Sequence, residues 1–521
     1  MTQTTHPDTA GKEHNRERSR PITVAAVSLS AALMTLDTTV VNVALPDIGA
    51  DFDATLSGLQ WIVNGYILAF AALLLSAGSL SDRLGRRGVF GIGMMIFTLA
   101  SLACAFASGQ GMLIAFRVIQ GLGASLVMGT GLALISGAYE GEDPKRRQMA
   151  IGIFTALGAA AAALGPLIGG TLVESAGWRS IFFLNIPLGV VIILATFTAV
   201  RPQPKTPGSR LDLGGASLAV LMLFALNYGL LTGSGESWDR PDVITTLVAA
   251  PVLLAAFLIV EHRLGTDAML DLSLFRIPTF TGAIVLSFAS RVASFGLFPL
   301  LILWLTGMLG HTPVEIGLIL LVLSGGMLLV APFSGALTRI APVRVLVAAG
   351  MVIAGAGLEW AGLVTTVDSD WTAILPCLIL LGLGSGIVMP HMMGLAVGVV
   401  PADRAGMASG TSNAFFPLGT AVGVAVYGAI MTAAISSRIT DPDLAQIVAA
   451  GRFDQLTDVL PAGSQALVTT AQSAFVDGLS QVFLIGGIAS ILSGLLALFL
   501  VRARDLPTST AHPAPVKEAH A

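Results

Sequence analysis

The feature that most constrains the fold is a series of fourteen long apolar stretches, spread over nearly the whole chain. Each approaches the roughly 20 residues that a helix needs to cross a bilayer. The chain is only 11% charged, whereas a soluble protein carries about 25% charged residues. Backbone groups in lipid must be satisfied within the segment, so each stretch is predicted to be helical. The predicted spans are 22–45, 57–79, 89–107, 111–136, 149–172, 181–200, 213–231, 243–260, 278–305, 316–338, 345–366, 371–398, 406–434 and 478–501.

The basic residues predict how these spans are oriented. Cytoplasmic loops carry an excess of Lys and Arg. If the N-terminus is cytoplasmic, the loops on the opposite side contain only Arg179, Arg240, Arg438 and Arg452 of the 27 basic residues. The sequence therefore predicts a multi-pass protein of the inner (plasma) membrane with both termini in the cytoplasm.

An internal repeat indicates two related halves. The sequence GLGASLVM at 121–128 reappears as GLGSGIVM at 382–389. Weaker copies, with nearly the same separation, link span 5 to span 13 and the loop after span 2 to the loop after span 10. Two six-helix halves with a site between them are a common transporter plan. The fold class predicted is thus an all-α integral membrane protein with two six-helix halves and two inserted helices.

The repeat also predicts how the chain is divided. The expected parts are a cytoplasmic tail (1–21), an N-terminal half (22–200), a linker with the two inserted helices (201–277), a C-terminal half (278–501) and a second cytoplasmic tail (502–521). Within the C-terminal half, residues 436–476 are predicted to form a long, irregular external loop with room for a short helix.

Five motifs carry a resemblance to a known family. They are DTTVVNVALP at 37–46, GSLSDRLGRR at 78–87, LIAFRVIQGLG at 113–123, GPLIGG at 165–170 and WRSIFFLNIP at 178–187. In this order they resemble the fourteen-helix drug:proton antiporter family of the major facilitator superfamily, and the resemblance covers residues 22–501. It implies the major facilitator fold and proton-coupled export of drugs or antibiotics.

The loop motif admits two interpretations. Its residues Gly78, Asp82, Arg83, Gly85, Arg86 and Arg87 lie in a tight cytoplasmic turn. The arginines hold the loop inside by their charge alone. The functional interpretation is a conformational latch, in which Asp82 contacts the start of span 13 near Gly406 across the interface between the halves. A helix N-terminus favours a carboxylate by about 0.3–1 kcal/mol.

The run in span 5 also has a packing and a functional interpretation. Pro166 is expected to kink the helix, and glycines allow another helix to approach closely. The resemblance implies that Gly165, Pro166, Gly169 and Gly170 mark exporters rather than importers, and this is compatible with a packing role.

Charged residues inside spans are costly and usually functional. Asp37 lies roughly 13 Å and Arg117 roughly 9 Å from the outer ends of their helices at 1.5 Å per residue, so the two residues can form a pair. One interpretation is a static ion pair that fixes helix packing. The other is proton coupling, in which Asp37 takes a proton from outside and releases it inside, controlled by movement of Arg117.

The second half contains two further charges, Glu359 and Arg291. Glu359 is predicted either to bind a cationic substrate, with Trp360 adding a cation–π contact, or to be a second proton site; a packing role is the alternative. Arg291 is predicted to pair with Glu359 or to bind an anionic group. The lone His391 is interpreted as a packing residue in preference to a proton relay.

A substrate pocket is predicted between the halves from depth, polarity and position in the repeat. In span 13, aromatic residues follow Asn413, where many relatives have an arginine, which indicates an apolar pocket wall suited to hydrophobic ligands. The candidate pocket residues are Asn42, Trp61, Asn64, Phe154, Arg291, Phe295, Trp304, Asn413 and Phe416.

The predicted function is proton:drug antiport by alternating access, without catalysis. The partners expected are a drug-like small molecule, protons and the bilayer, with no nucleic acid and no obligate protein partner. No cofactor or metal is expected, and the sequence has no nucleotide-binding loop. An importer on the same fold is the alternative. A membrane enzyme is disfavoured because its titratable residues would have to cluster.

Overall fold

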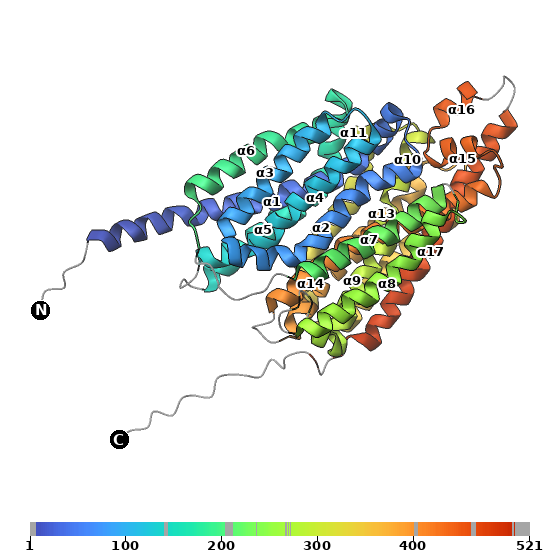
Figure 1. Ribbon diagram of the computed structural model, residues 1–521. Helices are drawn as coiled ribbons and strands as arrows, with labels where there is room; N and C mark the ends of the chain where they lie inside the picture. The colour runs from blue at the N-terminus through green and yellow to red at the C-terminus, as the bar shows by residue number, and fades with distance from the viewer. Residues whose placement is uncertain are drawn as a thin grey trace, which may run out of the picture.

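The computed structural model describes residues 7–139, 144–203, 212–235, 237–265, 268, 270, 272–400, 405–459, 465–502 and 505. All regular structure in this part of the chain is helical (Figure 1). The first half contains α1 (Pro7–Phe52), α2 (Leu56–Leu84), α3 (Arg86–Ala105), α4 (Gln110–Ala138), α5 (Pro144–Ala176) and α6 (Ser180–Ala199). The inserted pair is α7 (Leu213–Gly235) and α8 (Pro241–Leu264).

The second half repeats the order of the first. It contains α9 (Pro278–Phe295), α10 (Phe298–Gly307), α11 (Pro313–Leu337), α12 (Val343–Val364), α13 (Leu375–Gly398), α14 (Ala405–Ser436) and α17 (Gln465–Leu500). Short elements are η2 (Leu272–Arg276), η3 (Trp371–Ile374), α15 (Pro442–Ala449) and α16 (Phe453–Val459). Fourteen helical segments of the described chain are long and apolar enough to cross a membrane, as predicted.

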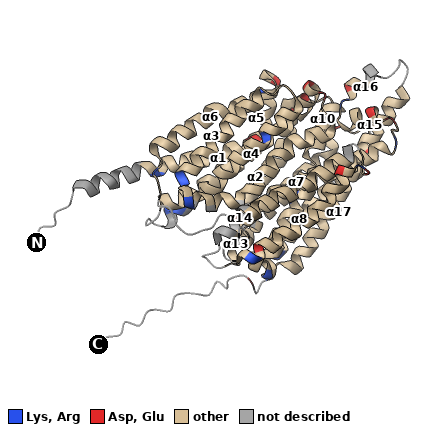
Figure 2. Ribbon diagram, viewed as in Figure 1, with Lys and Arg blue, Asp and Glu red and all other residues tan. Residues whose placement is uncertain are grey.

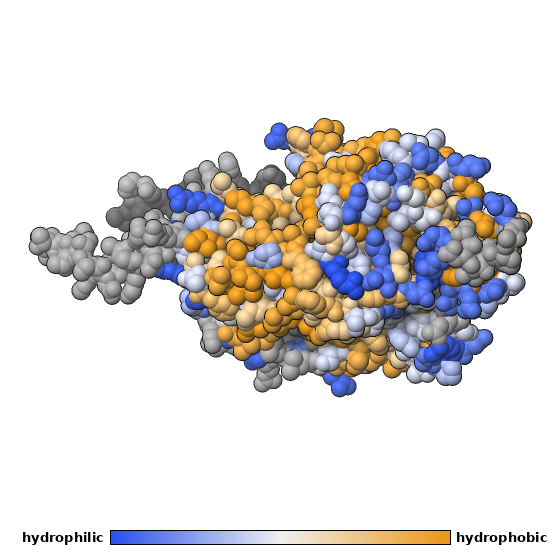
Figure 3. All heavy atoms as spheres, turned by 90° about the horizontal axis from the view of Figure 1, so that it is seen from above, coloured by the Kyte–Doolittle hydropathy of each residue, from blue (hydrophilic) through white to orange (hydrophobic). Residues whose placement is uncertain are grey.

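Helix α1 begins and helix α17 ends at the same end of the bundle, which we call the terminal end; the opposite end, with α15 and α16, is the distal end (Figure 1). Most Lys and Arg residues gather at the terminal end (Figure 2). Apolar residues cover the middle of the molecule and hydrophilic residues the distal end (Figure 3). This distribution is what a bilayer around the middle of the bundle requires.

One span and one loop differ from the prediction. The expected span 278–305 is broken between Phe295 and Phe298. Gly296 packs so closely on Gly423 of α14 that a Cβ would overlap its backbone, and Pro299 begins a new helix. The predicted loop 436–476 contains two short helices, α15 and α16, and its last part belongs to α17.

The apolar core shows where the halves join. One cluster of buried residues combines the first half with the distal parts of α10, α11, α13, α14 and α17. A separate cluster fills the second half at the terminal end, where it packs α9, α12, α13 and α17 against one another. The cores of the two halves are therefore continuous only toward the distal end.

Candidate functional site

A buried ion pair lies inside the first half. Arg117 on α4 donates from a terminal nitrogen to Oδ2 of Asp37 on α1 at 2.6 Å. Both side chains are 1% exposed. Their depths along the helices predict this pairing, and the structure brings them together. An ion pair in such surroundings is maintained only if its remaining polar atoms are also satisfied.

Two further side chains bond the carboxylate directly, and a third completes the network around it. Oδ1 of Asp37 accepts hydrogen bonds from Gln120 of α4 at 2.9 Å and from Asn185 of α6 at 2.7 Å. Ser101 of α3 accepts from the same two amides, at 3.0 Å and 2.7 Å. Four helices thus meet at one carboxylate, and the network is closed.

The arginine of this network is held separately. Arg117 also donates to the carbonyl of Ile62 at 3.3 Å and to Oε1 of Gln120 at 2.7 Å. Its guanidinium lies 4.2 Å from the ring centroid of Tyr66 and 6.0 Å from that of Phe182. A planar guanidinium stacks well on aromatic faces, so Arg117 keeps interactions with α2 and α6 that do not depend on Asp37.

Two members of the network were not singled out from the sequence. Asn185 belongs to the motif at 178–187, and as an amide in an otherwise apolar run it was a usable signal. Ser101 gave almost no such signal in the sequence, because a serine inside a membrane helix commonly bonds the backbone of its own helix.

The predicted pocket residue Asn42 lies on a different face of α1 from Asp37. At 100° per residue, Asn42 shares its face with Thr35, whereas Asp37 lies on roughly the opposite one. The Asn42 amide donates to the Thr38 carbonyl at 3.0 Å, and its Oδ1 is enclosed without a partner. The ion pair therefore points into the first half and Asn42 away from it.

Polar contacts join the halves toward the distal end. Gln60 and Asn64 of α2 donate to the carbonyls of Val424 and Ala421 on α14, at 2.8 Å and 3.2 Å. Asn64 also donates to Oδ1 of Asn227 on the inserted helix α7, at 3.3 Å. The predicted pocket residue Asn64 thus links three parts of the protein.

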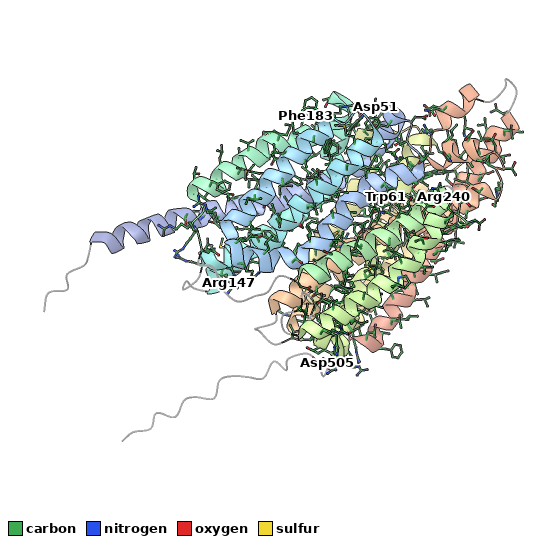
Figure 4. The ribbon with its side chains drawn as sticks, in the orientation of Figure 1. Asp51, Trp61, Arg147, Phe183, Arg240 and Asp505 are labelled. Carbon is green, nitrogen blue, oxygen red and sulfur yellow. The ribbon has the colours of Figure 1, made fainter. Side chains whose placement is uncertain are left out.

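The predicted pocket residue Trp61 packs against the inserted pair. Its ring centroid lies 5.6 Å from that of Phe224 and 6.4 Å from that of Tyr228. The Tyr228 hydroxyl donates to Asp242, which is paired with Arg240. Figure 4 labels Trp61 and Arg240 on this side of the molecule. Trp61 therefore contributes to the packing of α7 on α2.

The glycine run of α5 contacts two helices. A Cβ on Gly165 would overlap the Thr39 hydroxyl of α1, and one on Gly169 would lie 3.0 Å from Val40. A Cβ on Gly170 would instead overlap the carbonyl of Pro313 at the start of α11. This run therefore packs α5 on both α1 and the second half, next to Pro166 within the helix.

The loop motif forms contacts within the first half. Gly85 separates α2 from α3 with φ 103°, a conformation that favours glycine. Arg86 donates to the Ala133 carbonyl at 3.2 Å, and Arg87 donates to the Phe197 carbonyl. Gly78 continues α2 and Arg83 is exposed. The side chains of Asp82 and of the residues next to Gly406 lie outside the described part, so the latch stays a prediction.

The two charges of the second half have different neighbours. Glu359 lies against Gly487 of α17, with Oε1 enclosed and unbonded. Arg291 lies 3.9 Å from the Phe295 ring centroid, and its guanidinium is 3.7 Å from the Met389 sulfur. The Trp360 indole donates to the Ala373 carbonyl. Glu359 therefore faces the outer helix pair α12 and α17, and the predicted pairing with Arg291 is not formed.

The remaining candidates are placed as follows. Trp304 is fully buried in the distal core, and its place in the pocket stays a prediction. Phe154 is half-buried on α5. Nδ1 of His391 bonds the Ile387 carbonyl at 2.7 Å, which suits a packing role. The side chains of Asn413 and Phe416 lie outside the described part.

Comparison with known proteins gives relatives over most of the chain. The family model of the Major Facilitator Superfamily matches residues 27–293 and 283–440. Multidrug resistance protein Stp of Mycobacterium tuberculosis is 35% identical over 83% of this chain and 79% of its own length. The tetracenomycin C resistance and export protein of Streptomyces glaucescens is 32% identical over 96% of both chains.

Further similarity comes from a shorter alignment and from a solved structure. The methylenomycin A resistance protein of Streptomyces coelicolor is 33% identical over 79% of this chain and 85% of its own length. A crystal structure of a bacterial homologue of the human lysosomal transporter Spinster superposes with a TM-score of 0.66 at 17% identity. That alignment covers 94% of this chain and 98% of the other.

Proposed function

The chain belongs to the Major Facilitator Superfamily, and on that premise we propose that it exports drug-like small molecules in exchange for protons. Relatives named for resistance to tetracenomycin C and methylenomycin A support the substrate class. The observation that carries the proton coupling is the closed network around Asp37. It contains a carboxylate and a guanidinium, which form an ion pair buried from solvent.

The network supports a two-state scheme. Asp37 is ionised while Arg117 and the two amides bond it. Displacement of α4 relative to α1 would take Arg117 from the carboxylate, and a buried charge left without its partner is strongly unfavourable. Protonation removes that charge. Arg117 would keep its contacts with the Ile62 carbonyl and the Tyr66 ring in both states. Its guanidinium would therefore still have partners after it separates from Asp37.

Alternating access would couple this step to substrate movement. The described contacts between the halves lie toward the distal end, where α2 meets α14 and α5 meets α11. We propose that this is the state open at the terminal end, and that rocking of the halves breaks these contacts. Asn42, Phe154, Arg291 and Phe295 remain candidates for substrate contact, because none of them is fully buried. Asn413 and Phe416, whose side chains lie outside the described part, also remain candidates.

The direct test is transport by purified protein in liposomes. A pH gradient, acid on the distal side, is imposed across the membrane, and accumulation of a fluorescent cationic dye is followed. Antiport predicts accumulation that an uncoupler abolishes. Dye accumulation that is the same with and without the pH gradient would contradict proton coupling. Movement of the dye in the same direction as the protons would indicate an importer.

The orientation is testable independently of transport. We expect the terminal end to be cytoplasmic, so a thiol at Ser437, exposed near the distal end of α14, should react with a membrane-impermeant maleimide in intact cells. A thiol at Thr338, exposed at the terminal end of α11, should react only after lysis. The reverse pattern would invert the proposed topology.

Glu359 is proposed as a second proton site rather than a cation-binding residue. Its carboxylate lies against α17, away from the first half, so substrate charge should not matter to it. Replacement of Glu359 by Gln is expected to reduce accumulation of matched cationic and neutral substrates to the same extent. Reduced accumulation of the cationic substrate alone would support the cation-binding role instead. Unchanged accumulation of both substrates would indicate a packing role for Glu359.

A further inference from the structure

The two halves meet along two seams that face the membrane, and the inserted helices cover only one of them. The first seam lies between α2 and α14, and the second between α5 and α11. Helix α7 packs on both α2 and α14. Asn227 of α7 accepts from Asn64, which also bonds Ala421 of α14, and Phe224 of α7 packs on Trp61. The inserted pair therefore lies across the first seam.

Side-chain exposure differs sharply between the seams. Among the described side chains of α2 and α14, the only large apolar one that is exposed is Leu84, at the end of α2. The helices of the second seam have many exposed large apolar side chains. Exposed large apolar side chains of α5 and α11 are Met149, Ile153, Leu157, Leu164, Leu318, Leu328, Leu329 and Phe333.

Helix α5 parts from α11 toward the terminal end. Residues seven apart lie on nearly the same face of a helix. The face that Gly170 packs on α11 continues through Ala163, which is 5% exposed, to the exposed Ala156 and to Met149, which is 70% exposed. A Cβ on Gly152, beside this line, would meet no atom within 4 Å.

Helix α11 shows the same change along its opposing face. A Cβ on Gly317 would lie 2.6 Å from the Pro166 carbonyl. Ser324, about two turns further on, is 9% exposed, and Leu328, about three turns on, is 45% exposed. At Gly335, about five turns on, a Cβ would meet no atom within 4 Å. Both walls are thus sealed by glycine contacts at the distal end and open toward the terminal end, with apolar side chains at the opening.

We propose that lipophilic, membrane-partitioned molecules enter the space between the halves through the α5–α11 seam, and that α7 makes this lateral entrance one-sided. That molecules enter here for export rests on the proposed function, whereas the opening between α5 and α11 does not depend on it. The walls are apolar, so the ligand that fits is an amphiphile already dissolved in the leaflet at the terminal end. Strongly hydrophilic molecules would instead enter from the water at that end.

The entrance can be tested without transport, on the full chain in lipid nanodiscs. A thiol placed at Thr35 reports on the space inside the seam, because the Thr35 hydroxyl is 4.0 Å from a Cβ on Gly158 of α5 and shares a helix face with Asn42. The native Cys104 and Cys377 are buried, and protein without the new thiol gives the background. The probes are N-(1-pyrenyl)maleimide, which partitions into the bilayer, and a sulfonated maleimide in the water.

The variant Gly152→Phe should narrow the entrance without a clash, because space is free there. We expect the pyrenyl maleimide to react about tenfold more slowly, a barrier increase of about 1.4 kcal/mol, while the sulfonated reagent is unaffected. Ala156→Phe should act likewise. Ala255→Phe, on the exposed face of α8, is the matched control and should change neither rate.

Two results would overturn the proposal. Unchanged pyrenyl labelling in both α5 variants would show that the seam is not the route. Slower pyrenyl labelling in Ala255→Phe would place the route on the side of the inserted helices. Neither result bears on proton coupling, which the liposome assay measures separately.

Discussion

Replacement of Asp37 by Asn is expected to abolish proton-driven accumulation of substrate. The carboxylate accepts from Arg117, Gln120 and Asn185, and it is the proton carrier of the proposed coupling. An amide of the same shape cannot ionise, so the network would lose its response to protonation. Concentrative efflux should fall at least about 100-fold, comparable with the loss of a positioned acid–base group.

The measurement needs a control for folding, because removal of one partner of a buried pair costs about 3–5 kcal/mol. Downhill exchange of labelled substrate across the liposome membrane serves this purpose and should persist in Asp37→Asn. Asp47→Asn, on the same helix but nearer the distal end, is the matched control and should keep native accumulation. Uncoupler-sensitive accumulation at the native level in Asp37→Asn would rule out the proposed coupling role.

The second large effect is expected at Gly170, the residue through which α5 contacts α11. A Cβ there would overlap the Pro313 carbonyl and lie 2.6 Å from its carbon, and backbone cannot move aside as a flexible side chain can. Gly170→Val should therefore force the distal seam open, at a cost of about 1–3 kcal/mol to the closed state. The population of the distally open state should rise about tenfold for each 1.4 kcal/mol.

A thiol at Ile316 reports this opening, because Ile316 is 1% exposed beside the seam. Its reaction with a hydrophilic maleimide should be at least about tenfold faster with Gly170→Val than without it. Gly152→Val makes the same change on the same helix where no atom lies within 4 Å, and it should leave the rate unchanged. Equal rates in both variants would show that Gly170 does not seal the distal end.

The sequence determined which segments cross the membrane and much of what they can do. Backbone polar groups in lipid have to be satisfied within each segment, so every crossing helix is encoded locally and could be predicted from its apolar run. The ion pair was also predictable, because only four charges lie well inside spans and depth follows from helical rise. Asp37 and Arg117 were matched by depth alone.

The contacts between helices were decided by tertiary structure. Asn185 reaches Asp37 from 148 residues away, and nothing in its own segment shows which way the side chain points. Gly170 looks like its neighbour Gly169, yet the two pack on helices from different halves. For Glu359 the sequence left a substrate-binding, a proton-coupling and a packing role open, and the side chain faces α17. Trp61 and Asn64 were predicted in the pocket, and they pack on or bond to α7. The physical reason is that a helix satisfies its backbone at any rotation about its axis, so only packing against its neighbours selects the rotation and decides which side chains meet.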